Sequence, residues 1–168
     1  MRLDQRVCLV TGATGGIGQA LSQALAAAGA RLLLSGRDAS RLARLREQLP
    51  DGCVIDAIAA DQLEPADLAR LAEGAQRGGV NTLINLAGVN RLALFEDLDG
   101  AELATMVALN LTAPMRLTQL MLPQLKAAGN GLVVNVGSAF GSIGHPGYVA
   151  YCATKFGLRG FNEALRRE

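Results

Sequence analysis

The sequence contains no tryptophan, one histidine and three cysteines in 168 residues. Cys8, Cys53 and Cys152 are widely separated and lack the spacing of metal ligands, so we expect free, buried thiols and no metal site. Residues 1–4 lead directly into a strand-like pattern without the apolar stretch of a signal peptide. Together these features predict a protein of the reducing cytoplasm.

The sequence also lacks long apolar segments and an excess of charge of one sign. Polar residues such as Ser22, Gln23 and Arg31 interrupt every apolar stretch before it reaches the ~18 residues of a membrane span. The formal net charge is +1 and the basic residues form no block, which argues against a nucleic-acid partner. With 50% hydrophobic and 18% charged residues, the chain is predicted to fold as one domain over residues 1–168.

Short apolar runs alternate with helical patterns along the chain. Strands are predicted at residues 6–10, 31–35, 53–59, 82–86 and 131–136. Asp99 and Glu102 have the spacing of a capping box. Helices are predicted at residues 17–28, from the cap Asp38 to about Leu49, from Glu64-Pro65 onward, from the cap Asp99 to Leu125, and from about Tyr148 onward.

This alternation predicts an α/β fold, a Rossmann-like doubly wound parallel sheet built from right-handed βαβ units. Because the strands are apolar without alternation, we expect helices on both faces of the sheet. The expected order of the five strands is 3-2-1-4-5. Ligands of such sheets bind beyond the carboxyl ends of the strands, where the strand order reverses.

A glycine-rich turn, Thr11-Gly12-Ala13-Thr14-Gly15-Gly16-Ile17-Gly18, separates the first strand from the first helix. Glycines let backbone N–H groups approach a pyrophosphate at the N-terminus of a helix. The G-x-G-x-x-G fingerprint fails because Thr14 occupies the second glycine position, and a P-loop fails because Gln19 stands where lysine is needed. The glycine content nevertheless favours a phosphate-binding turn over a purely structural one.

The glycine turn resembles the T-G-x-x-x-G-x-G cofactor loop of short-chain dehydrogenases/reductases through Thr11, Gly12, Gly16 and Gly18. It also fits the T-G-x-x-G-x-x-G loop of the longer, epimerase-like branch of that family. The segment Asn85-Leu86-Ala87-Gly88, after the fourth strand, resembles the N-x-A-G of the short, single-domain branch and decides between the two. The family's later landmarks follow in order at matching spacing.

The resemblance implies a catalytic set of Asn110, Ser138, Tyr151 and Lys155. Tyr151 would protonate a carbonyl oxygen as hydride arrives from the nicotinamide, or act as the base in the reverse reaction. Lys155, four residues later on the same helix face, would favour the phenolate form and bind the nicotinamide ribose. Ser138 would hold the substrate oxygen.

The backbone at Asn110 has a further expected role. An α-helix would place the N–H of residue 114 on the carbonyl of Asn110, but Pro114 has no N–H. We expect Pro114 to kink the helix and to free this carbonyl. The resemblance implies a water there that relays protons to the active-site lysine; a packing kink alone is the alternative.

The resemblance also implies a nicotinamide dinucleotide, with Asp61 hydrogen-bonded to the adenine. Past the second strand, Gly36 is neutral and Arg37 cationic, where an acidic residue would bind the ribose 2′-OH of NAD. Asp38 is expected to cap the next helix, so NADP(H) is favoured and NAD(H) stays possible. The expected cofactor-binding residues are Thr11, Gly12, Thr14, Gly15, Gly16, Ile17, Gly18, Arg37, Asp61, Asn85, Ala87, Gly88, Tyr151 and Lys155.

The expected substrate is a small-molecule carbonyl compound or alcohol in a pocket made apolar by Phe140, Ile143 and Tyr148. Tyr148 is excluded as the acid because Cys152 stands four residues later, and we expect it to line the pocket or to pack. His145, in a His-Pro-Gly turn, is expected in an exposed loop. The resemblance implies a homodimer or homotetramer formed through the Gly100–Leu125 helix and the final helix.

Members of the short branch are longer than this chain, and the final helix is predicted to reach Glu168. We therefore expect a C-terminally incomplete member without its sixth and seventh strands, leaving an apolar sheet edge exposed. Two alternatives stay open. The chain could bind a dinucleotide as a non-catalytic regulatory protein, or act as an interaction subunit through its helices.

Overall fold

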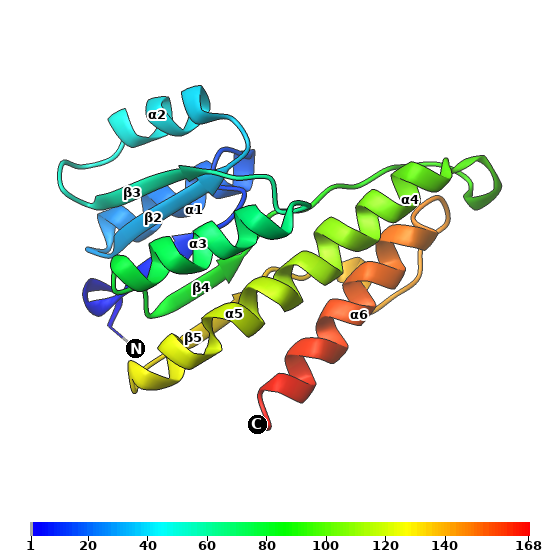
Figure 1. Ribbon diagram of the computed structural model, residues 1–168. Coiled ribbons are helices and arrows are strands. Elements are labelled where there is room, and N and C mark those ends of the chain that lie inside the picture. Colours follow the sequence, from blue (N-terminus) through cyan, green and yellow to red (C-terminus); the bar gives the residue numbers. More distant parts are fainter. Residues whose placement is uncertain (1) are drawn as a thin grey trace.

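The computed structural model describes residues 2–168, and its centre is a five-stranded parallel sheet (Figure 1). The strand order β3-β2-β1-β4-β5 confirms the prediction of a doubly wound sheet. The strands fall within one residue of their predicted ends. They are β1 (Val7–Val10), β2 (Arg31–Gly36), β3 (Val54–Ala59), β4 (Thr82–Asn85) and β5 (Leu132–Asn135).

The central strands β2, β1 and β4 are buried on both faces, which explains why they are apolar at successive positions, whereas the edge strands β3 and β5 are only partly buried. On one face Leu9, Leu33 and Leu83 form a core with leucines of α3 (Pro65–Arg77) and α5 (Ala113–Ala127). On the other face Leu32 and Leu34 form a core with leucines of α1 (Gly16–Ala27) and α2 (Ala39–Glu47). Because all the strands are parallel, their carboxyl ends lie at one edge of the sheet (Figure 1).

The predicted helix starts at Asp38 and Asp99 are present. The Asp38 carboxylate accepts hydrogen bonds from the amides of Ser40 and Arg41, and Asp99 caps α4 (Gly100–Val107) in the same way. The predicted capping box is wrong, because the Glu102 carboxylate forms an ion pair with Arg91, 3.5 Å away, instead of returning to the cap. This ion pair fixes the loop after β4 to the first turn of α4.

The helix predicted from the cap Asp99 to Leu125 is present from Gly100 to Ala127, but it is not α-helical throughout. A π turn, Ala108–Thr112, separates α4 from α5, and the amide of Ala113 donates to the carbonyl of Ala108 five residues earlier. Pro114 lies in the first turn of α5, where a missing N–H is tolerated. The π turn thus ends two residues before Pro114, and the kink expected at Pro114 itself stays a prediction.

The last helix, α6 (Val149–Leu165), packs against α4 and the π turn. It ends at Leu165, so the prediction that it reaches Glu168 is wrong: the amides of Arg167 and Glu168 donate to carbonyls three residues earlier and close a final tight turn. Three 3-10 turns complete the secondary structure at Leu3–Gln5, Phe95–Asp97 and Ala139–Gly141. No helix within residues 2–168 is long and apolar enough to cross a membrane.

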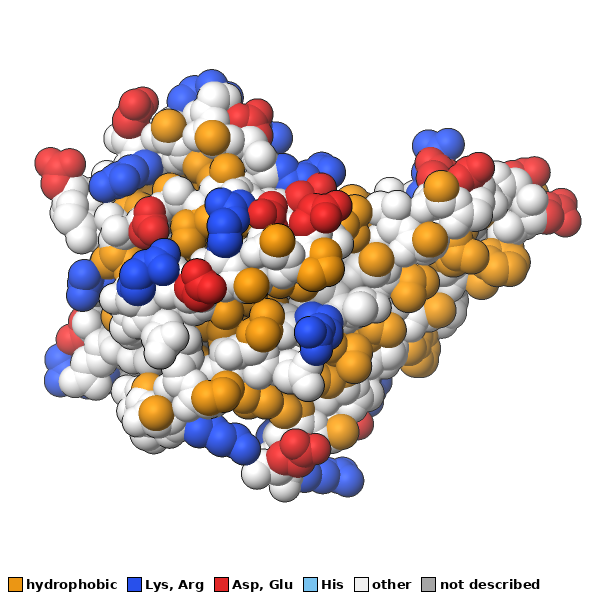
Figure 2. All heavy atoms as spheres, in the orientation of Figure 1, with side chains coloured by type: hydrophobic (Ala, Val, Ile, Leu, Met, Phe, Trp, Pro, Cys, Tyr) orange, Lys and Arg blue, Asp and Glu red, His pale blue; other side chains and the backbone are white. Residues whose placement is uncertain are grey.

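The face formed by α4 and α5 carries exposed hydrophobic side chains, as Figure 2 shows. Val107 of α4 and Met115 and Leu120 of α5 keep 38–40% of their surface exposed, and Phe156 of α6 keeps 43%.

Cys8 and Cys152 are buried and unpaired as predicted, whereas Cys53 is only half-buried because it precedes the edge strand β3.

Candidate active site

The glycine turn crosses the carboxyl end of β1 in a conformation that needs glycine at two positions. Gly12 has φ +64°, and a Cβ on it would lie 2.9 Å from the Cα of Ala87. A Cβ on Gly18 would lie 2.2 Å from the carbonyl oxygen of Gly12. The first turn of α1 therefore packs directly on the loop, and the loop packs directly on the segment after β4.

The N-terminus of α1 has no side chain over it. Gly15 is the N-cap, and it supplies no capping group. The amides of Gly16, Ile17 and Gly18 have no hydrogen-bond acceptor within residues 2–168. Free amides at the positive end of a helix dipole suit a bound phosphate, so the turn fits the pyrophosphate of a dinucleotide.

These amides open into a cleft of about 340 Å³ along the carboxyl ends of the strands. Most of the residues predicted to bind the cofactor line it, namely Gly12, Thr14, Gly15, Gly16, Ile17, Gly18, Arg37, Asp61, Ala87 and Gly88. The rest of the wall is formed by residues outside the predicted cofactor-binding set: Gly36, Arg41, Ala60, Gln62, Leu86, Val89 and Leu109.

Two arginines line the cleft near the end of β2. Arg37 was predicted there, but Arg41 was missed, although both follow the strand and Arg41 lies in the first turn of α2. The Asp38 carboxylate is occupied by the amides of Ser40 and Arg41 and by the Ser40 hydroxyl, which lower the pKa of Asp38. The cleft is therefore cationic at this corner, as an added phosphate would require.

Thr11 lies beneath the cleft instead of lining it. Its hydroxyl donates to the carbonyl of Ile84 at 3.2 Å and accepts from the amides of Leu86 and Ala87 at 3.0 and 3.1 Å. Thr11 therefore joins β1 to the segment after β4. Its effect on a cofactor would pass through the position of Ala87.

Asn85 also lies beneath the cleft, with 5% of its surface exposed. Its amide nitrogen donates to the hydroxyl of Thr118 at 3.1 Å and to the side-chain oxygen of Asn135 at 2.9 Å. The side chain thus joins β4 to α5 and β5. Its own oxygen, Oδ1, is buried without a partner within residues 2–168.

Asn110 is almost fully buried in the π turn and pairs with the backbone of Val89. Its Nδ2 donates to the Val89 carbonyl and its Oδ1 accepts from the Val89 amide, each at 2.8 Å. Nδ2 also lies 3.3 Å from the hydroxyl of Thr154, which in turn donates to the carbonyl of Tyr151 at 2.8 Å. The side chain of Asn110 therefore links the cleft wall to the helix that bears Tyr151.

Tyr151 and Lys155 lie on one face of α6, as their spacing predicted. The Lys155 Nζ is 5.7 Å from the centroid of the Tyr151 ring and donates to the carbonyl of Val136 at 2.9 Å. Only 7% of Lys155 is exposed, and this burial lowers its pKa. The structure thus places a desolvated cation beside the phenol.

Ser138 is the residue before the 3-10 turn Ala139–Gly141, and its hydroxyl accepts from the amide of Phe140 at 3.2 Å. The hydroxyl hydrogen stays available to a further acceptor. Ser138 and Lys155 line the same small hollow of about 180 Å³ between β5 and α6. Two members of the predicted catalytic set, Ser138 and Lys155, therefore lie at the same hollow.

The Tyr151 ring belongs to a cluster of four aromatic rings. Phe140 stacks on His145 with centroids 4.9 Å apart, and the Phe140 ring lies 5.0 Å from Tyr148 and 6.4 Å from Tyr151. His145 is exposed in its loop as predicted, while Tyr148 packs among the rings. The contacts of His145 could not be foreseen because they depend on the fold of the 139–148 loop.

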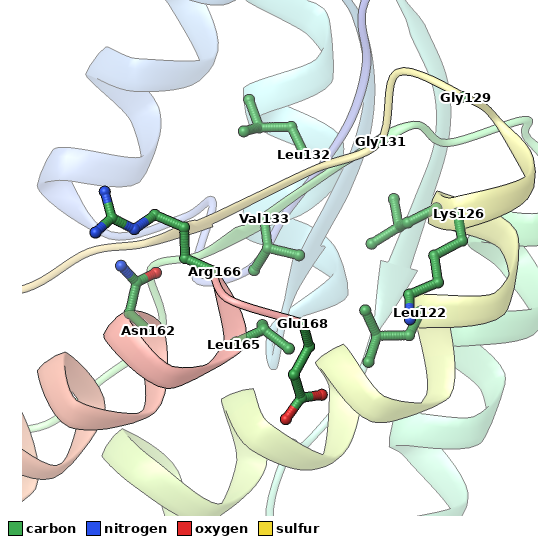
Figure 3. Close-up of a pocket in the computed structure, with 11 residues that line it drawn as sticks. Leu122, Lys126, Gly129, Gly131, Leu132, Val133, Asn162, Leu165, Arg166 and Glu168 are labelled. Atoms are coloured by element: carbon green, nitrogen blue, oxygen red, sulfur yellow. The ribbon is translucent and has the colours of Figure 1, made fainter.

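A larger pocket, of about 500 Å³, lies between β5 and the ends of α5 and α6. Figure 3 shows leucine and valine side chains of these three elements gathered around it, including Leu122, Leu132, Val133 and Leu165. It contains none of the residues predicted for cofactor binding or catalysis. The residues predicted for cofactor binding lie instead at the cleft by the glycine turn, and Ser138 and Lys155 lie at the smaller hollow between β5 and α6.

Comparisons with known proteins agree with this geometry. A family model described as short chain dehydrogenase matches residues 6–168. A nodulation protein G of Rhizobium meliloti (strain 1021) is 38% identical over 167 residues, covering 99% of this chain and 68% of that protein. A 3-oxoacyl-(acyl-carrier-protein) reductase of Vibrio cholerae is 32% identical over 168 residues, covering 100% of this chain and 69% of that protein.

Solved structures share the fold. A metagenomic short-chain oxidoreductase crystallised in complex with NADP has a TM-score of 0.88 and 32% sequence identity, covering 99% of this chain and 78% of that one. The chain spans about two thirds of the length of the curated relatives it matches, between 65% and 68% for the first four.

Proposed function

Because the chain belongs to the short-chain dehydrogenase family, we propose that it is an NAD(P)-dependent oxidoreductase acting on a carbonyl compound or secondary alcohol. The proposal rests on the buried Lys155 ammonium beside the Tyr151 ring, on the same edge of the sheet as the open amides of the glycine turn. The cleft would hold the dinucleotide through these amides and through Asp61, Ala87 and Gly88. When bound, the nicotinamide supplies or accepts the hydride.

Tyr151 gives a proton to the substrate oxygen in the reducing direction and removes it in the oxidising direction. The buried Lys155 ammonium, 5.7 Å from the centroid of the Tyr151 ring, would offset negative charge that develops there during proton transfer. Ser138 accepts from the Phe140 amide, so its own O–H is free to donate to the substrate oxygen and stabilise charge there.

Asn110 contributes through its backbone. Its side chain is occupied by Val89 and Thr154, and Pro114 has no N–H to offer its carbonyl. We assign to this carbonyl a water that passes protons to Lys155. High-resolution diffraction would contradict this role by showing the carbonyl bonded only to protein.

NADP(H) is the proposed cofactor, with NAD(H) as the weaker ligand. Arg37 and Arg41 both line the cleft, and the nearby Asp38 carboxylate is already occupied at the cap of α2. A guanidinium suits the 2′-phosphate that distinguishes NADPH from NADH. The NADP bound by the metagenomic relative supports this choice.

We further propose a homodimer or homotetramer in the cytoplasm. The partly exposed Val107, Met115, Leu120 and Phe156 on the helix face give such an interface its apolar surface, and the three unpaired cysteines suit a reducing compartment. Light scattering after size-exclusion chromatography would show a mass above the 17.5 kDa of one chain. A monomeric mass at micromolar concentration would contradict the interface.

The test of function is an assay of NADPH oxidation with a panel of small ketones and aldehydes. The loss of NADPH absorbance measures the rate of this oxidation. Turnover of at least one carbonyl compound is expected. Binding of NADPH without turnover of any would favour the non-catalytic, dinucleotide-binding alternative. No binding of either dinucleotide would overturn the proposal.

A further inference from the structure

The carbonyl oxygen of Thr14, in the middle of the glycine turn, receives two side-chain hydrogen bonds. The Nε2 of Gln19, in the first turn of α1, donates to it at 2.9 Å. The Nη2 of Arg41, in the first turn of α2, donates to it at 2.7 Å. A carbonyl oxygen has two lone pairs, so this acceptor is fully used by two different helices.

Thr14 is the only residue between Gly12 and Gly16 that is neither glycine nor alanine. Gly36, at the end of β2, leaves room for the Thr14 side chain, since a Cβ on Gly36 would lie 2.9 Å from the Thr14 Oγ1. The neighbouring amide of Gly15 is also fixed, because it donates to the Gly12 carbonyl at 3.0 Å. The Thr14–Gly15 peptide is therefore held on both its C=O and its N–H side.

A peptide in a glycine turn can rotate at small cost, because glycine accepts backbone angles that other residues avoid. If the Thr14 carbonyl turned into the cleft, its partial negative charge would face the anion that the amides of Gly16 and Ile17 are placed to receive. The hydrogen bonds from Gln19 and Arg41 prevent this rotation. They keep the turn in the form that offers N–H groups to the cleft.

We infer that Gln19 and Arg41 are positioning residues of the dinucleotide site, which act by clamping the Thr14 carbonyl. Gln19 is half-buried and does not line the cleft, so it reaches a ligand only through Thr14. Arg41 does line the cleft and adds its charge there. The inference rests on the proposed dinucleotide binding.

The test compares the dissociation constants of NADPH and NADH, by calorimetry on the full chain, for Gln19→Met, Arg41→Met and the double variant. Gln19→Met removes one donor without changing charge, so it is expected to weaken both ligands by the same factor, roughly threefold to tenfold. Arg41→Met is expected to weaken NADPH more than NADH. Each single variant keeps one donor, which still restrains the carbonyl in part. The double variant keeps none, so it is expected to lose more NADH affinity than the product of the single losses.

Two matched controls lie one turn further along the same helices, at exposed positions outside the cleft: Gln23→Met on α1 and Arg44→Met on α2. Neither is expected to change either constant. Amide hydrogen exchange on the ligand-free chain gives a second readout. The amide of Gly15, which donates to the Gly12 carbonyl, is expected to exchange faster in the double variant, while the later turns of α1 keep their protection.

Unchanged NADH affinity in Gln19→Met, or a double variant that equals the product of the single effects, would overturn the clamp while leaving the dinucleotide site intact. Failure of the unsubstituted chain to bind NADPH or NADH would instead overturn the proposed function, and the clamp with it.

Discussion

The Lys155 ammonium, on α6, donates a hydrogen bond to the carbonyl oxygen of Val136, just beyond β5, across 2.9 Å. This is the only hydrogen bond of that ammonium within residues 2–168, and no carboxylate of this part of the chain forms an ion pair with it. The charge is thus buried with one neutral partner. Such an arrangement weakens the fold and suits a group kept for its effect on a neighbouring phenol.

Replacing Lys155 by methionine is therefore expected to stabilise the fold while removing activity. Loss of the buried charge should raise the free energy of unfolding by about 1–2 kcal/mol at neutral pH, measured by urea denaturation. Lys126→Met, at the exposed end of α5, is the matched control and should leave stability within about 0.5 kcal/mol of the parent. A less stable Lys155→Met variant would contradict this account.

The gain should depend on pH. Burial lowers the pKa of Lys155 in the folded state below the 10.5 of an ordinary lysine, so between these values the unfolded chain binds more protons. Stability of the parent therefore rises with pH across that window, and the advantage of Lys155→Met should shrink. A constant difference between neutral pH and pH ~10.5 would show that Lys155 titrates normally.

Replacing Tyr151 by phenylalanine removes the hydroxyl and keeps the ring. The packing against Phe140 and Tyr148 should persist, so the variant is expected to fold and to bind NADPH as before. Turnover of the carbonyl panel should fall at least a hundredfold, since general acid catalysis contributes about that much or more. Tyr148→Phe is the control, and it should keep most of the activity. More than a few per cent of turnover in Tyr151→Phe would remove Tyr151 from the proposed chemistry.

Replacing Arg37 by glutamine should change cofactor preference. The variant loses a guanidinium at the cationic corner, and we expect the KM for NADPH to rise about tenfold to a hundredfold with little change for NADH. Arg44→Gln, on α2 but outside the cleft, removes the same charge and should leave both values unchanged. A parent chain that prefers NADH would overturn the assignment of NADPH.

Replacing Asn110 by alanine should destabilise the protein strongly. The change leaves the amide and carbonyl of Val89 without their side-chain partners, and we expect a loss of about 2–5 kcal/mol in urea denaturation. Asn90→Ala, at an exposed neighbouring position, should cost less than about 0.5 kcal/mol. Equal effects of the two substitutions would show that the pairing with Val89 contributes little.

The fold could be predicted because its determinants are local. Unalternating apolar strands, the caps Asp38 and Asp99 and the proline at residue 65 each have a physical reason that operates within a few residues. The π turn could not be located from composition, and its buried Asn110 pairs with Val89, which is distant in sequence. The ion pair of Glu102 could not be predicted either, because its partner Arg91 lies outside α4, in the loop after β4.

The candidate site divides in the same way. The glycine turn and the Tyr151–Lys155 pair have fixed spacing within one element, and the structure places them at the same edge of the sheet. Arg41 escaped prediction because its contact with Thr14 joins two segments 27 residues apart. Thr11 and Asn85 were predicted near the cofactor, but their side chains bind the neighbouring backbone and helices below the cleft.

The π turn sets the rotation of α5 about its own axis. Each α-helical residue advances by about 100°, so the extra residue of a π turn rotates everything after it by about that angle relative to α4. Leu117 and Met121 have no exposed surface and face the sheet only in the rotated phase. Deleting one residue between 108 and 112 would restore an α-helix and swing these side chains away from the sheet. The π turn thus determines which side of α5 faces the sheet for a given orientation of α4.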